Sequence, residues 1–486
     1  MFLLYSLVFS IPLQIGLELE FGYFVIILLG FFLFLRFFIP FLLGVEIAAA
    51  LDVVTHSETP VNTSYIVACC TFDERIDIKA IISKINERAF LHPCHRKLQK
   101  LFRSFIGIYY WRKDPHFSLE NHIEVLNTYF YDNDELYQFM NKQASQVRFP
   151  KNMPEWKFFL VPNMPYKKSG IILKIHHGIS DGLSLMNYVL NLGDSKEYGL
   201  VHLPKISKCR WILIYLIGLI EILKFAVKVI IRKKDDNLFK NERMLGKKNS
   251  YCSEALDLTI IKNYAKHLGI SVNAIFLALL AKAVNNCYLR IFQKDLKNFS
   301  LMIAVSTLPM PAKNQIYPLG NNITFMPQDI INDKPEQNFQ DYVLEYHKTL
   351  KSSKTDYSIY IQRMAGTFVY HILPACVNEF LMNYLTNNHS GIYTSFPGPT
   401  TPVSLFGYEV KDLCFFVTGI GQTRMVYNIM TYNGKFNLAC SVDESTNIDC
   451  KVLIEEFQKL VENLTKKENG KTKFNEKALL QETDSL

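Results

Sequence analysis

The chain has 486 residues, of which 49% are hydrophobic, and a formal net charge of +8 at pH 7. This length exceeds what one ordinary hydrophobic core holds, so two lobes are expected. The basic residues are spread along the chain and form no zinc-finger, RNP or basic-zipper pattern, which argues against nucleic-acid binding. The ten cysteines include no C-x-x-C pair, so the sequence predicts no metal site and no disulfide framework.

Residues 1–50 are expected to form a membrane anchor. Residues 21–45 are apolar except for Arg36 and exceed the length of about 20 residues that crosses a bilayer. No Lys or Arg precedes Arg36, which argues against a cleaved signal peptide. Residues 1–17 are also apolar, so a helical hairpin stays open, as does a buried pair of helices. Basic residues after this segment favour a body on the cytosolic side.

The first lobe is assigned to residues 51–200. Its strands are expected at 65–70, 158–161 and 171–175, and a helix with apolar residues at helical spacing is expected near 78–89. These elements alternate in a way that is typical of an α/β domain.

A connector is assigned to residues 201–250. Within it, residues 211–231 are apolar except for Glu221, Lys224 and Lys228, which share one helical face. This pattern favours a helix lying in a membrane interface, while a spanning helix or a core-facing helix remains open.

The second lobe is assigned to residues 251–465. We expect helices at 260–268, 271–280 and 448–463, and strands at 301–306, 391–396, 413–418, 425–432 and 435–442. Residues 466–486 are charged and are expected to be disordered.

The segment from His176 to Gly182 carries the strongest chemical signal. It joins the strand at 171–175 to a helical pattern at 183–190. A histidine held at a strand end can act as a general base near neutral pH. Asp181 is expected to fix the loop, and Gly182 to permit a tight turn with positive φ. The alternative is an exposed pair of histidines on a turn.

This segment resembles the HHxxxDG motif of the acyl-CoA-dependent acyltransferase superfamily. Further segments, in the same order, resemble the wax ester synthase/diacylglycerol acyltransferase (WS/DGAT) family. They are Val272-Asn273, Leu319-Gly320-Asn321, Thr394-Ser395-Phe396-Pro397-Gly398-Pro399 and Thr431-Tyr432-Asn433-Gly434. Ala274 stands where the family has Asp, Ser395 where it has Asn, and Thr431 where it has Ser. Because Ala274 has no carboxylate, a role for a carboxylate at that position is in doubt.

The resemblance implies an α/β fold of two chloramphenicol-acetyltransferase-like lobes with a central tunnel. His177 would be the general base, His176 its supporting neighbour, Asp181 a loop-shaping residue paired with a basic side chain, and Gly182 a point of close backbone approach. The candidates for orienting substrate are Asn273, Asn321, Ser395 and Asn433. Two of these candidates also have a structural alternative. Asn433-Gly434 is typical of a hairpin turn, and Asn273 is typical of a helix start.

The implied function is transfer of a fatty acyl group from acyl-CoA to a long-chain alcohol or diacylglycerol. Acyl-CoA is a co-substrate, and no cofactor or metal is expected. The remaining alternatives are another acceptor (a sterol, a short alcohol or an amine) or an inactive membrane-anchored lipid-binding protein. The expected partners are acyl-CoA, the acceptor lipid and membrane lipids, and the expected location is the endoplasmic reticulum membrane with the body facing the cytosol.

Overall fold

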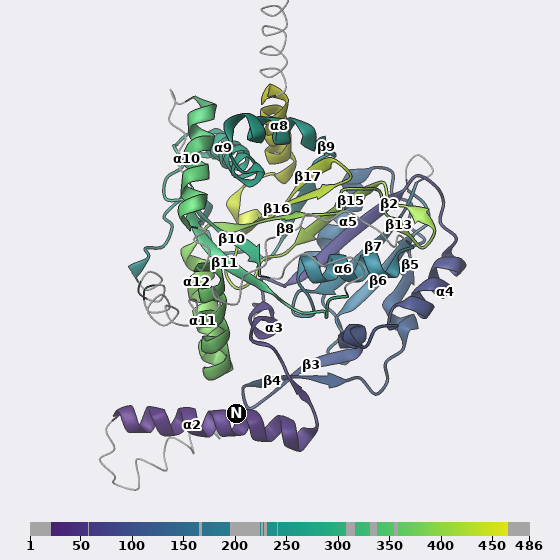
Figure 1. Ribbon diagram of the computed structural model, residues 1–486, viewed down its shortest axis with the longest axis vertical. Coiled ribbons are helices and arrows are strands. Elements are labelled where there is room, and N and C mark those ends of the chain that lie inside the picture. Colours follow the sequence, from purple (N-terminus) through teal and green to yellow (C-terminus); the bar gives the residue numbers. More distant parts are fainter. Residues whose placement is uncertain are drawn as a thin grey trace, which may run out of the picture.

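The computed structural model describes residues 21–56, 58–164, 168–194, 224, 227, 231–240, 242–307, 316–330, 338–353 and 358–464. Residues 1–17, almost all of the apolar segment 211–231, and the tail 466–486 lie outside these ranges, so the expectations for them stay predictions. The described chain forms two larger β-sheets with helices packed around them (Figure 1). The predicted mixed α/β architecture is confirmed.

The first sheet has the strand order β15-β2-β7-β6-β5, in which all pairs are antiparallel except β5 and β6. Its strands are β15 (Asp412–Val417), β2 (Tyr65–Phe72), β7 (Ser169–His176), β6 (Trp156–Val161) and β5 (Ile123–Val125). The predicted strands at 65–70, 158–161 and 171–175 are therefore confirmed. The helices that follow or precede them are α3 (Ala50–Thr55), α4 (Ile78–Arg88), α5 (Asn133–Ser145) and α6 (Gly182–Leu192).

The second sheet has the strand order β11-β10-β12-β16-β17-β8, and β9 (Leu256–Asp257) also pairs with β17. Its strands are β11 (Ile323–Asp329), β10 (Ser300–Ser306), β12 (Gly391–Pro397), β16 (Met425–Tyr432), β17 (Lys435–Asp443) and β8 (Lys248–Cys252). The helices of this part are α8 (Leu258–Leu268), α9 (Val272–Phe292), α10 (Phe339–Ser353), α11 (Ser358–Ile372), α12 (Ala375–Asn388) and a helix over residues 450–464. The sequence did not predict α10, α11 or α12.

The remaining elements are short. A three-stranded sheet has the order β1-β4-β3, and β13 pairs with β14. Their bounds are β1 (Glu46–Ile47), β3 (Lys100–Phe105), β4 (Ile108–Lys113), β13 (Ser404–Leu405) and β14 (Tyr408–Glu409). Short 3-10 helices are η1 (Pro93–Gln99), η2 (Leu119–His122), η4 (Leu238–Lys240) and η5 (Glu444–Thr446).

One strand crosses between the two predicted lobes. β15 belongs by sequence to the assigned second lobe, yet it pairs with β2 along the register Asp412↔Thr71 to Val417↔Ile66. The first sheet therefore contains a strand from residues 251–465, which a division into two continuous segments does not describe. The boundaries of the two lobes otherwise stay a prediction.

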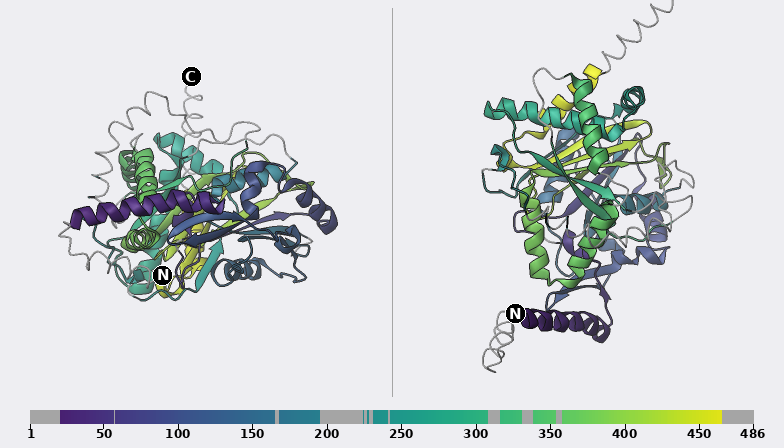
Figure 2. Two further views of the ribbon diagram at one scale, coloured as in Figure 1. Left: turned by 90° about the horizontal axis from the view of Figure 1, so that it is seen from below. Right: turned by 60° about the vertical axis from the view of Figure 1, so that its left-hand side comes forward.

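Two helices bear on the membrane expectation. Among the described residues, α9 is the one helix whose length and composition would allow it to cross a membrane, and 61% of its apolar window is buried inside the protein. It packs within the core of the second sheet. The apolar helix α2 (Phe21–Leu43) instead lies at the edge of the molecule, away from both large sheets (Figures 1 and 2).

Candidate active site

The histidine loop joins β7 to α6, as the sequence predicts. His176 is the last residue of β7, and His177 follows it with its backbone N–H bonded to the carbonyl of Ser64 at 2.7 Å. Asp181 is the N-cap of α6, where its carboxylate accepts the backbone N–H of Ser184 at 2.8 Å. Strand and cap hold the loop at both ends.

The side chain of His177 is oriented by Asn321. Oδ1 of Asn321 lies 3.0 Å from Nδ1 of His177. Nδ2 of Asn321 donates to Oδ1 of Asp52 at 3.1 Å and to the carbonyl of His177 at 2.9 Å. Both of those partners can only accept, so the amide has one favourable orientation and Oδ1 must be the acceptor. His177 therefore carries its proton on Nδ1, which leaves Nε2 with a lone pair.

Asp52 is itself held by two further donors. Its Oδ2 accepts Nζ of Lys97 at 2.7 Å and Nε1 of Trp111 at 3.1 Å. The Lys97–Asp52 pair is buried, with side-chain exposures of 11% and 4%. Sequence reasoning missed these three residues. The available signal was the position of Asp52 in an apolar stretch, where a buried carboxylate needs partners.

Asp181 ties the loop to the segment that carries Asn321. Its Oδ2 accepts the backbone N–H of Asn322 at 2.6 Å, and its own N–H donates to the carbonyl of Gly320 at 3.1 Å. We expected the Asp181 carboxylate to bind a basic side chain. Its hydrogen bonds come instead from backbone N–H groups, so this expectation is wrong. Arg363 instead donates to Oδ1 of Asn322 at 2.8 Å.

The expectation of a positive φ at Gly182 is also wrong. Gly182 begins α6 and is absent from the residues with positive φ, and an added Cβ would meet Phe396 at an ordinary 3.6 Å. The close approach occurs at Gly178. A Cβ there would lie 1.8 Å from Cε1 and 1.9 Å from Nδ1 of His56. The loop therefore requires glycine at Gly178 and not at Gly182.

His177 lies on the wall of an apolar cavity whose lining comes from strands of both sheets. The cavity has an empty volume of about 1240 Å³, part of it open to solvent, and Asp181 and Gly182 line it beside His177. Most of its wall is aliphatic or aromatic. Representative lining residues are Ile66, Leu173, Phe396, Phe415, Val426 and Met430. Such a wall suits a hydrocarbon chain rather than a polar ligand.

Burial keeps the His177 imidazole neutral. Desolvation is the largest effect and lowers the pKa of His177 below its usual 6.5, and the neighbouring His176 lowers it further, while Asp181 and Asn321 oppose the shift. A neutral imidazole with its proton on Nδ1 presents Nε2 as a base at pH 7.

None of the four substrate-orienting candidates lines the cavity. Ser395 lies between Thr394 and Phe396 on β12, and these two neighbours line the cavity while Ser395 points to the other face. Asn273 accepts the hydroxyl of Tyr393 at 2.8 Å on that same far side. Both are corrections.

Asn433 and Gly434 form the tight turn between β16 and β17. Their φ angles are 47° and 74°, as the hairpin alternative requires. Asn433 is thus a turn residue and not an orienting group in the cavity. Asn321 is the fourth correction, since it positions His177 instead of substrate.

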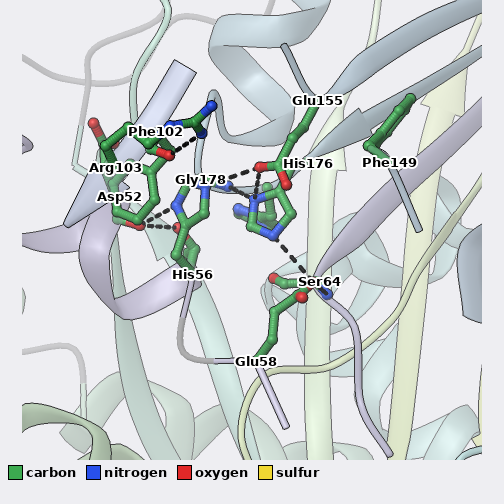
Figure 3. Close-up of polar contacts among 12 residues, drawn as sticks. Asp52, His56, Glu58, Ser64, Phe102, Arg103, Phe149, Glu155, His176 and Gly178 are labelled. Atoms are coloured by element: carbon green, nitrogen blue, oxygen red, sulfur yellow. Dashed lines mark hydrogen bonds and ion pairs between the residues drawn. The ribbon is translucent and has the colours of Figure 1, made fainter. Parts of the chain in front are cut away.

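His176 is buried and supports the loop from a polar cluster with His56, Glu58 and Glu155 (Figure 3). Its Nε2 lies 3.2 Å from Oε1 of Glu58, and its ring stacks on His56 with centroids 4.0 Å apart. Nε2 of His56 lies 3.2 Å from Oε2 of Glu155. Burial opposes charge on His176, but the two carboxylates outweigh it and raise the pKa of this imidazole.

His56, Glu155 and His176 bring ligand atoms close enough for a metal ion. The fit is poor, because Nδ1 of His176 accepts the N–H of Gly178 at 3.0 Å and its Nε2 faces Glu58. Neither nitrogen of His176 is left open toward a shared centre, so we assign the cluster a structural role.

Comparisons with known proteins show what this chain is similar to. Residues 319–465 match the family model of the WS/DGAT C-terminal domain. A Mycobacterium tuberculosis (strain CDC 1551/Oshkosh) protein named "Probable diacyglycerol O-acyltransferase tgs1" is 20% identical over 368 residues, which are 69% of this chain and 77% of that protein.

Two solved structures share the fold. The wax ester synthase/diacylglycerol acyltransferase of Marinobacter aquaeolei VT8 aligns with a TM-score of 0.60 and 16% identity, covering 86% of this chain and 98% of that one. A mutant starter condensation domain of rhizomide synthetase, solved with C8-CoA and Leu-SNAC, aligns with a TM-score of 0.55 and 10% identity, covering 86% and 93%. At these identities the structures establish the fold alone, and the similarity to the WS/DGAT family rests on the match of residues 319–465 and on the curated relative.

Proposed function

We propose that this protein is a membrane-bound O-acyltransferase that moves a fatty acyl group from acyl-CoA to a lipid alcohol. The products would be a wax ester from a long-chain alcohol or triacylglycerol from diacylglycerol. The observation that carries the proposal is the imidazole of His177, held by Asn321 with Nε2 unprotonated, on the wall of an apolar cavity. The match of residues 319–465 to the WS/DGAT C-terminal domain and the similarity to the curated relative support the same activity.

The chemistry follows from the tautomer. Nε2 of His177 takes the proton of the alcohol as its oxygen attacks the thioester carbon, and the C–S bond then breaks. The same imidazole returns the proton to the departing thiolate, which yields the ester and free CoA. General-base assistance of this kind contributes roughly 10²–10⁴-fold. A thioester is already activated, so the proposal needs no covalent intermediate, cofactor or metal.

The substitution His177→Ala tests this assignment. Purified protein would be incubated with labelled acyl-CoA and a panel of lipid alcohols, with free CoA and ester both measured. We expect ester formation to be lost while acyl-CoA still binds. His116, which is exposed, gives a matched control as His116→Ala. Unchanged turnover in His177→Ala would refute the assigned base, and a wild type that binds acyl-CoA without turnover would favour the lipid-binding alternative.

We further propose that α2 attaches the protein to a membrane. One side of α2 packs on the body, where Phe32 and Ile39 contact Ile108. Its other side is exposed and aromatic, with Phe37 70% and Phe41 85% exposed. Exposed apolar surface of this extent marks an interaction site, and a lipid bilayer is the occupant that such a helix suits.

Membrane attachment has its own test. Phe37→Glu combined with Phe41→Glu should reduce flotation with phospholipid vesicles, whereas Leu91→Glu, at a residue 69% exposed elsewhere, should not. We propose the endoplasmic reticulum with the body in the cytosol as the location. The sequon at Asn298, an exposed residue, reports on this orientation. A glycan on Asn298 in cells would place the body in the lumen and overturn it.

A further inference from the structure

Asn428 is a buried amide whose polar atoms are unpaired. It lies in β16 with 0% exposure. Neither Oδ1 nor Nδ2 has a hydrogen-bond partner among the residues that the structure describes. Burying an amide without partners destabilises the fold, so native proteins rarely keep one without a functional reason.

The side chain of Asn428 lines the same cavity as His177. Val426, Asn428 and Met430 alternate along β16 onto one face, and all three line this cavity. Other buried polar side chains on the wall have partners. Oγ1 of Thr55 donates to the carbonyl of Leu51 at 2.9 Å, and Oγ1 of Thr418 accepts the N–H of Tyr65 at 2.9 Å.

The strand register places Asn428 along the wall from the segment that holds His177. Asn321 lies two residues before β11, and a row of paired residues crosses the sheet from β11 to β16. This row is Phe325, Ala304, Thr394 and Asn428. Three strand spacings separate its ends, a distance of about 14 Å. The Asn321 segment that positions His177 therefore meets the sheet three strands away from Asn428.

We propose that Asn428 binds a carbonyl group of the substrate inside the cavity, with Nδ2 donating to the carbonyl oxygen. This inference rests on the proposed acyl transfer and specifies its substrate recognition. An otherwise apolar wall selects a hydrocarbon ligand, and the unpaired amide selects one that carries a carbonyl within the chain.

Two kinds of substrate carry a carbonyl group that Asn428 could bind. A glycerolipid acceptor carries ester carbonyls near its hydroxyl, while the pantetheine arm of acyl-CoA carries amides that also offer an N–H to Oδ1. A simple long-chain alcohol has no such group. A site with a buried donor discriminates against the analogue that leaves this donor unpaired.

The substitution Asn428→Leu removes both polar atoms at nearly constant shape. Its kcat/KM would be compared with wild type for two acceptors, a 1,2-diacylglycerol and hexadecanol, and for two donors, an acyl-CoA and the matching ethanethiol thioester. We expect a loss of about 10–100-fold that is confined to substrates carrying the recognised carbonyl. Loss with diacylglycerol alone identifies the ester, and loss with the CoA donor alone identifies the amide. An equal loss with all combinations, or no loss, would overturn the proposal.

Asn286→Leu, in α9 and outside the cavity lining, is the matched control and should leave all four rates near wild type. A second measurement does not depend on turnover. Without ligand, Asn428→Leu should raise the melting temperature, because the unpaired amide is gone, and it should reduce the further rise caused by CoA or by dioleoylglycerol in micelles. A lower melting temperature would show a structural role and refute the proposal. If wild type has no turnover, the proposed function fails while this measurement still decides the role of Asn428.

Discussion

His177 and Asn321 lie 144 residues apart in the chain and meet through a 3.0 Å hydrogen bond between Nδ1 and Oδ1. Asp52 fixes the amide that makes this contact, because its carboxylate can only accept from Nδ2. A chain of three side chains thus selects the tautomer of the imidazole. The protonation of the His177 ring is therefore determined by residues from α3, the β7–α6 loop and the segment before β11.

The substitution Asn321→Leu should uncouple the imidazole from this chain. We expect kcat to fall by roughly 10²-fold or more, within the range that general-base catalysis contributes, with little change in KM. The tautomer can be observed directly by ¹⁵N NMR of labelled histidine, with the His177 signals identified by their loss in His177→Ala. Wild type should show the Nδ1–H form. A variant with unchanged tautomer and unchanged kcat would show that Asn321 does not position His177.

The buried pair of Asp52 and Lys97 makes a stability prediction. Asp52→Leu leaves Lys97 as a buried charge without its carboxylate, which should cost about 3–5 kcal/mol of unfolding free energy. Adding Lys97→Met should recover much of this loss. Lys100 and Glu46 form an exposed pair, so Lys100→Met should change stability by less than about 1 kcal/mol. Denaturant unfolding measures all three. A double variant no more stable than Asp52→Leu would contradict the argument.

The two glycines of the histidine loop should respond differently to alanine. Gly178→Ala forces a methyl group into the ring of His56 and should destabilise the protein by about 1–3 kcal/mol. Gly182→Ala meets only an ordinary contact with Phe396 at the start of α6 and should be neutral or slightly stabilising. Thermal unfolding of the two variants compares them directly. Equal destabilisation would mean that the position of His56 does not decide the effect.

Local elements could be predicted from the sequence, and their contacts could not. The strand before His176 and the helix after Asp181 follow from hydrophobic periodicity and a capping residue, and both were placed correctly. Asn321 was singled out for the wrong role. No local pattern shows that its amide reaches His177, because that contact depends on how the segment before β11 lies against the β7–α6 loop.

The errors at Ser395 and Asn273 have a common physical cause. Alternate residues of a strand face opposite sides, and the sequence of β12 does not say which side faces the cavity. Thr394 and Phe396 face it, so Ser395 does not, and Asn273 bonds Tyr393 on the other side. Asn428 was missed for the same reason, since only the folded register puts it on the cavity wall.

Activity should depend on pH through His177. Burial lowers its pKa below the usual 6.5, so the imidazole stays neutral at pH 7 and loses its function only in acid. We therefore expect kcat/KM to be flat from pH 7 to 8 and to fall at a midpoint below 6.5. Initial rates in buffers of constant ionic strength measure this profile. A midpoint above 6.5 would mean that the base is stabilised in its charged form, contrary to the burial seen here.

His122 should make the stability of the fold depend on pH, with stability lower in acid. It is buried, its Nδ1 lies 2.7 Å from the carbonyl of Trp156, and burial lowers its pKa from 6.5 to about 4. The unfolded chain therefore binds this proton more tightly, so stability is lost as pH falls from 6.5 toward 4. In His122→Gln the unfolding free energy should be lower at pH 7.5 yet decline less between pH 6.5 and 4.5 than in wild type. The exposed His116 provides the control as His116→Gln, which replaces a histidine and leaves the buried His122 in place. A wild-type slope retained in His122→Gln would assign the pH dependence to other groups.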